Sequence, residues 1–229
     1  MYPEQLNMST EIRQAHAGAW QTISATGAFF TGEQRAAMVR AARDAQECDL
    51  CLQRREALSP NAVHGKHLNQ GPLDETIVEV VHRVRMDPGR LTKQWFEEVT
   101  QSLGQAAYIE IVSVVASAVI IDTLHNALGL GLAPLHPAQS STPSHQVNDT
   151  VVDGGAWVPI LDADQTMADT GLPRVPNIAR ALGLVPSALD LFFAIFRPLY
   201  QLKNINLSIS QAQAEFVAAR VSAMNECFY

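Results

Sequence analysis

The sequence predicts an all-α protein with two related helical halves. Apolar residues recur at helical spacing in most segments, and alternating strand patterns are few. Two stretches that both end in Glu-Cys, 31–48 and 210–227, also align with each other without a gap. With 47% hydrophobic and 17% charged residues, the chain has enough apolar side chains to form a sizeable core.

In the first half, the pattern predicts four helices separated by Gly and Pro. Thr31 is the expected N-cap of the first, because its hydroxyl can accept a hydrogen bond from a backbone N–H of the first turn. The expected helices cover Thr31–Leu58, 73–86, 91–103 and 105–128, and their ends are marked by Ser59-Pro60, Asp87-Pro88-Gly89, Gly104 and Gly129.

The longest apolar run, from Ala106 to Ile121, lies in the fourth of these helices and contains Glu110. It is shorter than the roughly 20 apolar residues that span a bilayer. We therefore expect a buried core helix and no membrane association.

The second half begins after a predicted linker, 134–156, which combines three prolines with Asn148-Asp149 and Gly154-Gly155. Helices are expected at 177–182, at 187–200 and from residue 208 onward. The chain is thus divided into an N-terminal helical half with a C-x-x-C motif (1–133), the linker (134–156) and a C-terminal half (157–229).

The internal repeat rests on a few shared positions. Alanine-rich helices resemble one another easily, so coincidence stays open beside the duplication that we expect. The correspondences are Thr31 with Ser210, Gln34 with Gln213, and Glu47-Cys48 with Glu226-Cys227.

Charge and the N-terminal sequence limit the function classes. The formal net charge is -7, which argues against a nucleic-acid surface, since such a surface needs basic patches to neutralise phosphates. No basic stretch followed by an apolar run opens the chain, so we expect no signal peptide and a cytoplasmic protein. In that compartment three cysteines indicate redox chemistry, metal binding or packing rather than a disulfide framework.

Cys48-Asp-Leu-Cys51 is a C-x-x-C motif. At the start of a helix this spacing lets two sulfurs meet, so that one thiolate attacks a peroxide or disulfide and the other resolves the product. Metal binding and inert packing remain alternatives. A zinc site would draw on His64 and His67, although only two residues separate them, whereas zinc-finger histidines are usually separated by three to five. The alternative without a function places both histidines in a loop after Pro60.

The C-terminal segment carries a more specific pattern. Glu215 is followed by a helix rich in alanine and valine and then by Asn225-Glu-Cys227-Phe-Tyr229. This resembles the motif of the alkylhydroperoxidase D-like (carboxymuconolactone decarboxylase-like) family, in which a Glu precedes Asn-x-Cys-x-Tyr-Cys and a later His. Further similar stretches, which extend the resemblance over most of the chain outside the linker, are Tyr108-Ile-Glu110, Asp122–Gly129, Pro176–Leu182 and Arg197–Tyr200.

The resemblance implies a helical bundle typical of that family and a thiol peroxidase mechanism. In the family the second cysteine attacks a hydroperoxide, the first resolves the sulfenic acid as a disulfide, and the Glu and His relay protons. By this resemblance Glu215 is a proton relay and Cys227 the resolving thiol.

The C-terminal motif departs from the family at its end. The sequence stops at Tyr229, one position before the attacking sulfur, and the relay His is missing. This suggests truncation. One hypothesis is a selenocysteine codon read as a stop, and a trimmed chain or a frameshift would give the same sequence.

The N-terminal motif departs as well. Ala36 replaces the Glu and Arg55 replaces the His, so Arg55 and Glu33 become candidate stand-ins, or else ordinary surface charges. Two further acid–His pairs at a spacing of three, Glu79/His82 and Asp122/His125, are either acid/base units or structural ties between helices.

Together these features predict a thiol-dependent, or selenol-dependent, hydroperoxide reductase with Cys48, Cys51, Glu215 and Cys227 as catalytic residues. We expect no metal and no cofactor. The expected partners are a hydroperoxide, a thiol reductant and further copies of the chain. A carboxymuconolactone decarboxylase-type enzyme of the same fold and a catalytically inactive relic are the alternatives.

Overall fold

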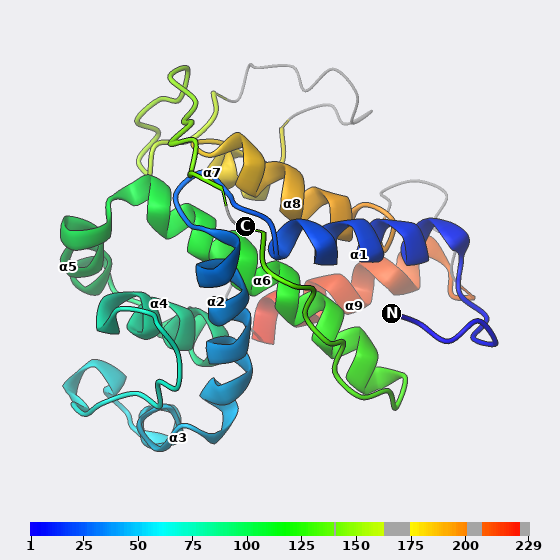
Figure 1. Cartoon of the computed structure of the whole chain (residues 1–229), viewed down its shortest axis with the longest axis horizontal. Helices are drawn as coiled ribbons and strands as arrows, with labels where there is room; N and C mark the ends of the chain where they lie inside the picture. The colour runs from blue at the N-terminus through cyan, green and yellow to red at the C-terminus, as the bar shows by residue number, and fades with distance from the viewer. Residues whose placement is uncertain (140, 163–174, 201–207, 225–229) are drawn as a thin grey trace.

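The computed structural model describes residues 1–139, 141–162, 175–200 and 208–224. Within these ranges the chain forms nine α-helices and three short 3-10 helices, and the described residues include no strand, only an isolated bridge between Val152 and Ile160. The predicted all-α class is confirmed. Figure 1 shows the order of the helices, which are α1 Thr10–Ile23, α2 Gly32–Asp44, α3 Asp49–Glu56, α4 Glu75–Met86, α5 Lys93–Leu103, α6 Gln105–Ala127, α7 Asn177–Leu182, α8 Pro186–Phe196 and α9 Gln211–Met224.

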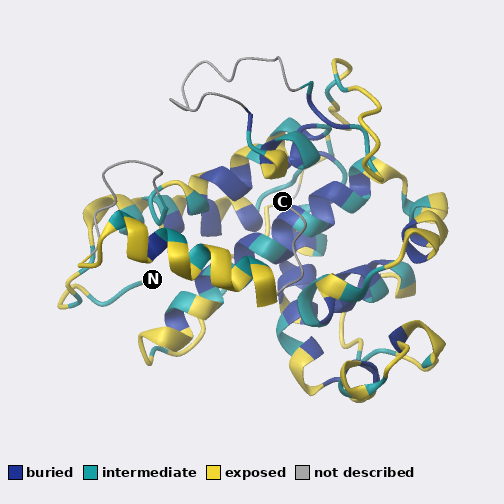
Figure 2. Ribbon diagram, turned by 180° about the vertical axis from the view of Figure 1, so that it is seen from behind, coloured by how far each residue is buried: buried dark blue, intermediate teal, exposed yellow. Residues whose placement is uncertain are grey.

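The predicted apolar helix is the centre of the fold. α6 packs against α2, α4 and α8, and the side chains of Ile111, Val114 and Ile121 are fully buried there. By length and composition α6 could cross a membrane, but the core helix of a soluble protein passes the same test. Figure 2 shows that burial is concentrated on α6 and the helix faces turned toward it, as expected of a core helix.

The core joins both sides of the predicted linker. α8 packs against α1 and α6, and Leu191 and Ile195 of α8 belong to the same apolar cluster as Trp20 of α1. Between α6 and α7, the backbone N–H groups of Gln139, His145 and Asn148 donate to the carbonyls of Ser24, Ala28 and Leu184. The two halves therefore share one core.

The predicted helix Thr31–Leu58 is wrong in one respect, because the chain breaks it in two. Its start is confirmed: Thr31 caps α2 in a capping box with Gln34. After Asp44 one 3-10 turn, Ala45–Glu47, leads to Cys48, whose backbone is extended (φ -76°, ψ 117°) and which becomes the N-cap of α3. No Gly or Pro marks this break, so local sequence signals could not predict it.

Two ion pairs fasten α2 to α6. Arg43 and Asp122 form a bidentate pair at 2.8 and 2.9 Å, and Arg35 lies 3.4 Å from the buried Glu110. Asp122 therefore does not pair with His125, whose Nδ1 lies 2.9 Å from the carbonyl oxygen of Gly131. Asp122 thus joins α6 to α2, and His125 joins α6 to the segment that follows it. This agrees with the structural role, rather than the acid/base role, that the sequence left open for the two residues.

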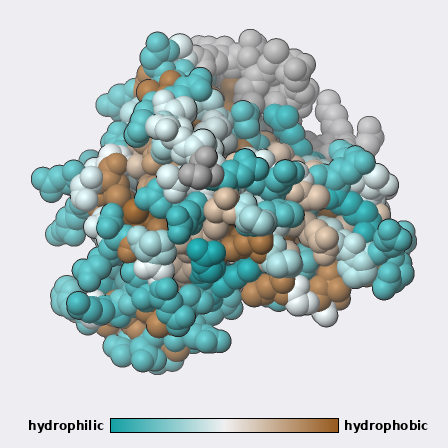
Figure 3. Space-filling view, viewed as in Figure 1, coloured by the Kyte–Doolittle hydropathy of each residue, from teal (hydrophilic) through white to brown (hydrophobic). Residues whose placement is uncertain are grey.

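α9 differs from α2 in its surroundings. Of its described residues only Ala214 is buried, whereas most of α2 is buried. The face of the molecule drawn in Figure 3 is mostly hydrophilic, with apolar side chains scattered over it. The repeat of α2 and α9 thus stays a sequence prediction.

Candidate functional site

Cys48 and Cys51 lie together at the junction of α2 and α3. Because Cys48 is the N-cap of α3, the C-x-x-C spacing places Cys51 in the first turn of that helix, with the two Sγ atoms no more than 4.8 Å apart. Both cysteines are free thiols, and their exposed fractions are 1% and 3%. They pack with Ala45 and Leu50 in a small apolar cluster of their own.

His67 reaches this pair from the irregular segment that follows α3. Its Nδ1 lies 3.5 Å from the Sγ of Cys48 and 3.5 Å from the Sγ of Cys51. The next residue, Leu68, donates its backbone N–H to the Cys48 sulfur at 3.3 Å. The segment between residues 63 and 74 thus crosses the cysteines and contacts both.

His82 approaches from the other side, on α4. Its Nδ1 lies 3.3 Å from the Sγ of Cys51, and its ring centroid is 4.4 Å from that of His67. One donor atom from each of Cys48, Cys51, His67 and His82 lies within 4.8 Å of every other. We call these four residues the Cys-His cluster.

Glu79, one turn before His82 on α4, fixes the orientation of His67. Its carboxylate accepts hydrogen bonds from His67 Nε2 at 2.7 Å, from Arg54 Nη1 at 2.9 Å and from Trp95 Nε1 at 2.9 Å. Because Nε2 carries the hydrogen that this carboxylate accepts, Nδ1 faces the sulfurs with a free lone pair. Burial acts to raise the pKa of Glu79, but the hydrogen bonds from His67 and Arg54 lower it to about 2.

The two thiols are electrostatically unequal. Burial acts to raise the pKa of Cys48, whereas the backbone amides of Leu68 and Cys51 and the His67 ring act in the opposite direction, and the pKa lies below its usual value. Burial and the nearby charge of Cys48 raise the pKa of Cys51 to about 12. Of the two thiols, Cys48 is therefore the one that loses its proton more readily.

His82 is held in its neutral form. Burial, followed by the neighbouring His67, lowers the pKa of His82 to about 4. A neutral imidazole so close to a sulfur can accept a thiol proton or act as a metal ligand.

A surface pocket of about 610 Å³ leads toward the cluster, with His67 and Glu79 in its wall. Lys66, Asn69 and Glu75 also line it. Within the described part of the chain, His67 is the cluster member that both faces this pocket and contacts the two buried sulfurs. The pocket and the thiols therefore communicate through one imidazole ring.

Not all of the predicted site residues meet here. Glu215 lies on α9, which Figure 1 places far from α3, and accepts hydrogen bonds from Tyr200 Oη at 2.6 Å and Gln211 Nε2 at 2.5 Å. Cys227 lies outside the described residues. The structure therefore places Glu215 apart from Cys48 and Cys51.

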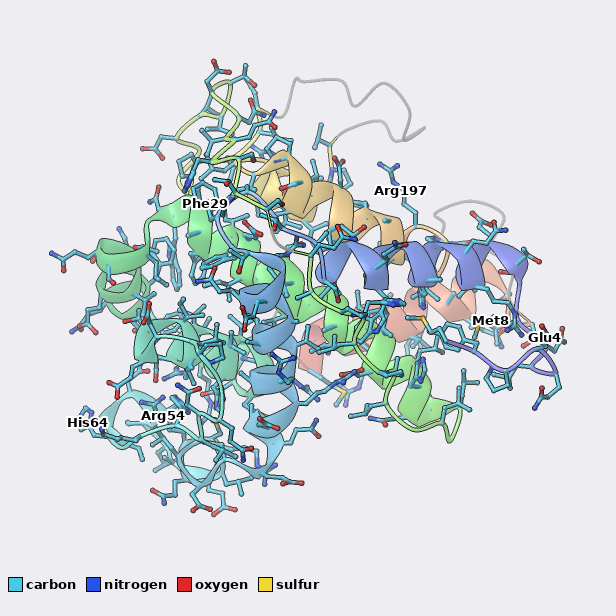
Figure 4. All side chains as sticks on the ribbon, viewed as in Figure 1. Glu4, Met8, Phe29, Arg54, His64 and Arg197 are labelled. Carbon is cyan, nitrogen blue, oxygen red and sulfur yellow. The ribbon has the colours of Figure 1, made fainter. Side chains whose placement is uncertain are left out.

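The stand-ins proposed for the N-terminal motif are also placed elsewhere. Arg55 and Glu33 are exposed, whereas the adjacent Arg54 is buried and pairs with Glu79. His64 is exposed as well, and Figure 4 shows it at the outer edge of this region, with Arg54 nearer to the helices. Of the two histidines that the zinc alternative named, His67 therefore lies against the cysteine sulfurs and His64 does not.

His82 is the site residue that sequence reasoning missed as a neighbour of the cysteines. The Glu79-x-x-His82 spacing did indicate one shared helix face, and both side chains turn toward the cluster. What the spacing could not indicate was which part of the chain that face would meet.

Comparison with known proteins adds no relative. No family model, no curated protein and no solved structure matches this chain. The resemblance to the alkylhydroperoxidase D-like family thus rests on the quoted residues alone.

Proposed function

We propose that this chain is a thiol-dependent hydroperoxide reductase in which Cys48 attacks the peroxide and Cys51 resolves the product. One observation carries the proposal: the Cys48 sulfur accepts the Leu68 amide and touches His67, which faces the pocket and is anchored by Glu79. A thiolate stabilised in this way, with a proton relay between it and solvent, is the arrangement that thiol peroxidases need.

The reaction is a two-electron reduction of the peroxide. The Cys48 thiolate attacks one peroxide oxygen and the O–O bond breaks, which leaves Cys48 as a sulfenic acid. His67 Nδ1 takes the proton that Cys48 gives up on forming the thiolate, and then donates it to the departing alkoxide, which leaves as the alcohol. The sulfur of Cys51 then forms a bond to that of Cys48, and the hydroxyl leaves with the Cys51 proton as water. An external thiol reduces the resulting disulfide.

This assignment reverses the order that the resemblance implies, in which the second cysteine attacks. The reason is local. Cys48 is the N-cap of α3 and its sulfur accepts the Leu68 N–H. Cys51 lies three residues further along the helix, and its pKa is raised to about 12. A resolving thiol can stay protonated until the sulfenic acid is formed, so the unequal pair suits this order.

A single-turnover experiment tests the proposal. Reduced, metal-free protein receives one equivalent of an organic hydroperoxide, and mass spectrometry follows the thiols. We expect a Cys48–Cys51 disulfide in the natural chain, a trapped sulfenic acid on Cys48 in Cys51→Ser, and no reaction in Cys48→Ser. His64→Ala is the matched control, since His64 is exposed and outside the cluster. A sulfenic acid on Cys51 in Cys48→Ser would reverse the roles.

The same variants separate the alternatives. A decarboxylase-type enzyme needs no cysteine, so its activity would survive in Cys48→Ser. An inactive relic would consume no peroxide in any form, and its thiols would not oxidise reversibly.

The other expected partners fit this proposal. A reducing cytoplasm would supply the thiol that regenerates the pair. Self-association is supported by an exposed apolar stripe on α9, formed by Val217, Val221 and Met224 at helical spacing with Phe216 beside it. We propose a second copy of the chain as the partner of this stripe.

A further inference from the structure

The donor atoms of the Cys-His cluster have a second chemical capacity besides thiol oxidation. Two cysteines and two histidines are one of the usual ligand sets of structural zinc, because soft thiolates and imidazoles both suit this ion. Within the described part of the chain, the Cys-His cluster is a group of four such donors that lie close enough together to hold one metal ion.

The spacing of the donors matches the ion. A tetrahedral zinc with Zn–S bonds of about 2.3 Å and Zn–N bonds of about 2.0–2.1 Å separates neighbouring sulfur and nitrogen ligands by about 3.5 Å. The sulfur–nitrogen distances here are 3.5, 3.5 and 3.3 Å, for Cys48–His67, Cys51–His67 and Cys51–His82. The other donor pairs lie within 4.8 Å, so small shifts of these side chains would bring all four donors around one ion.

His67 has the surroundings that are typical of a metal-binding histidine. His67 Nε2 is bonded to Glu79 at 2.7 Å, so Nδ1 is the free donor and its direction is fixed. A carboxylate behind a ligating histidine is the usual outer contact of zinc sites. Two thiolates would also neutralise the charge of the ion, which matters at sulfurs exposed by only 1% and 3%.

The ligands also come from three separate parts of the chain. The cysteines lie at the start of α3, His82 on α4, and His67 in the stretch between η2 (Pro60–Ala62) and α4, which has no helix or strand. One ion would tie that stretch to both helices, and such a tie contributes to folding stability.

We propose that the reduced chain binds one Zn²⁺ ion through Cys48, Cys51, His67 and His82. This inference does not depend on the proposed peroxidase activity. If both proposals hold, a hydroperoxide oxidises the two thiolates to a disulfide. The hydroperoxide takes up their two electrons and two protons and becomes an alcohol and water. The disulfide no longer binds the ion, which is released. Binding of the ion and a turnover of peroxide are then mutually exclusive at this site.

The test uses the full reduced chain, stripped with a chelator and titrated with Zn²⁺ alone against a chromophoric competitor. We expect one ion per chain, and Co²⁺ in its place to give the intense visible bands of tetrahedral thiolate coordination. His82→Ala and Cys48→Ser should each weaken binding more than the about 10–100-fold typical of outer-contact changes, and Glu79→Gln by about that amount. His64→Ala is the control and should bind as the natural chain does.

Absence of a stoichiometric ion overturns the proposal, as does unchanged affinity in His82→Ala. If His82→Ala does not fold, X-ray absorption on the natural chain decides: two sulfur and two nitrogen ligands support the site, and any other set overturns it. The peroxide assay uses metal-free protein, so a chain that binds zinc but ignores peroxide, or the reverse, separates the two proposals.

Discussion

His67 and Glu79 are joined by a 2.7 Å hydrogen bond that turns the other nitrogen of the imidazole toward both cysteine sulfurs. The carboxylate is itself held by Arg54 and Trp95, so the ring direction is set by three separate contacts on Glu79. Both proposed capacities of the Cys-His cluster depend on this one orientation.

Glu79→Gln should therefore slow peroxide consumption by about 10–100-fold, because the amide no longer holds the charged hydrogen-bond network around His67. The measurement is the initial rate with a dithiol as electron donor. Glu75→Gln is the matched control, since Glu75 lines the same pocket but is largely exposed. Equal rates in the two variants would show that the anchor is unimportant.

Addition of Zn²⁺ should raise the melting temperature of the reduced, metal-free chain. At 100 times the dissociation constant an ion that binds only the folded state adds about 2.7 kcal/mol. For a chain of this size that corresponds to a rise of about 5–10 °C. Scanning calorimetry with and without the ion measures it, and His82→Ala should show no rise.

Glu110→Ala should destabilise the fold by about 3–5 kcal/mol. It would leave Arg35 buried without its 3.4 Å partner, and it would remove the carboxylate that accepts the Phe29 N–H at 2.6 Å. Urea unfolding measures the change. Glu98→Ala, at an exposed position on α5, is the control and should shift stability little. A loss below about 1 kcal/mol in Glu110→Ala would contradict the structural role of the pair.

The stability of the fold should also decrease as the pH is lowered, because of His16. Burial lowers the pKa of His16 to about 4, with a further contribution from His125, while the unfolded value is about 6.5. Between these values the unfolded chain binds a proton that the folded chain does not, so the free energy of unfolding decreases as pH falls from about 6.5 to 4. The loss is at most about 3 kcal/mol.

His16→Asn should flatten this part of the profile, measured by urea unfolding at several pH values. His136→Asn is the control, because His136 is exposed. An unchanged slope in His16→Asn would assign the pH dependence to other groups.

Phe216→Glu combined with Val221→Glu should shift the chain from oligomer to monomer in light scattering. The two carboxylates would face the apolar partner surface and be desolvated there. If the natural chain is already a monomer, the α9 stripe has another occupant and the self-association proposal fails.

Much of the fold followed from local signals. The capping residue Thr31, the stop at Gly104 and the uninterrupted apolar run of α6 each act through the chain's nearest neighbours or through simple burial, so their positions were predictable. The end of α2 was not. Cys48 leaves the helix because it packs under the segment around Leu68, and a contact of that kind overrides helix propensity without leaving a local mark.

The candidate site shows the same division. The C-x-x-C spacing identified Cys48 and Cys51, and the Glu79-x-x-His82 spacing identified a helix face. Bringing the two together depends on the path of the chain between α3 and α4, which has no periodic pattern to read. His67, within that path, could be named only as one of two loop histidines.

That irregular stretch has a consequence for the outside of the protein. Its inner contacts are with sulfur, through His67 and Leu68, while Lys66 and Asn69 are exposed at the rim of the pocket. A disulfide at Cys48 would weaken the sulfur as an acceptor of the Leu68 amide and so loosen the backbone that presents those two side chains. Antibodies or proteases directed at residues 64–70 would then distinguish chemical forms of cysteines that they never touch.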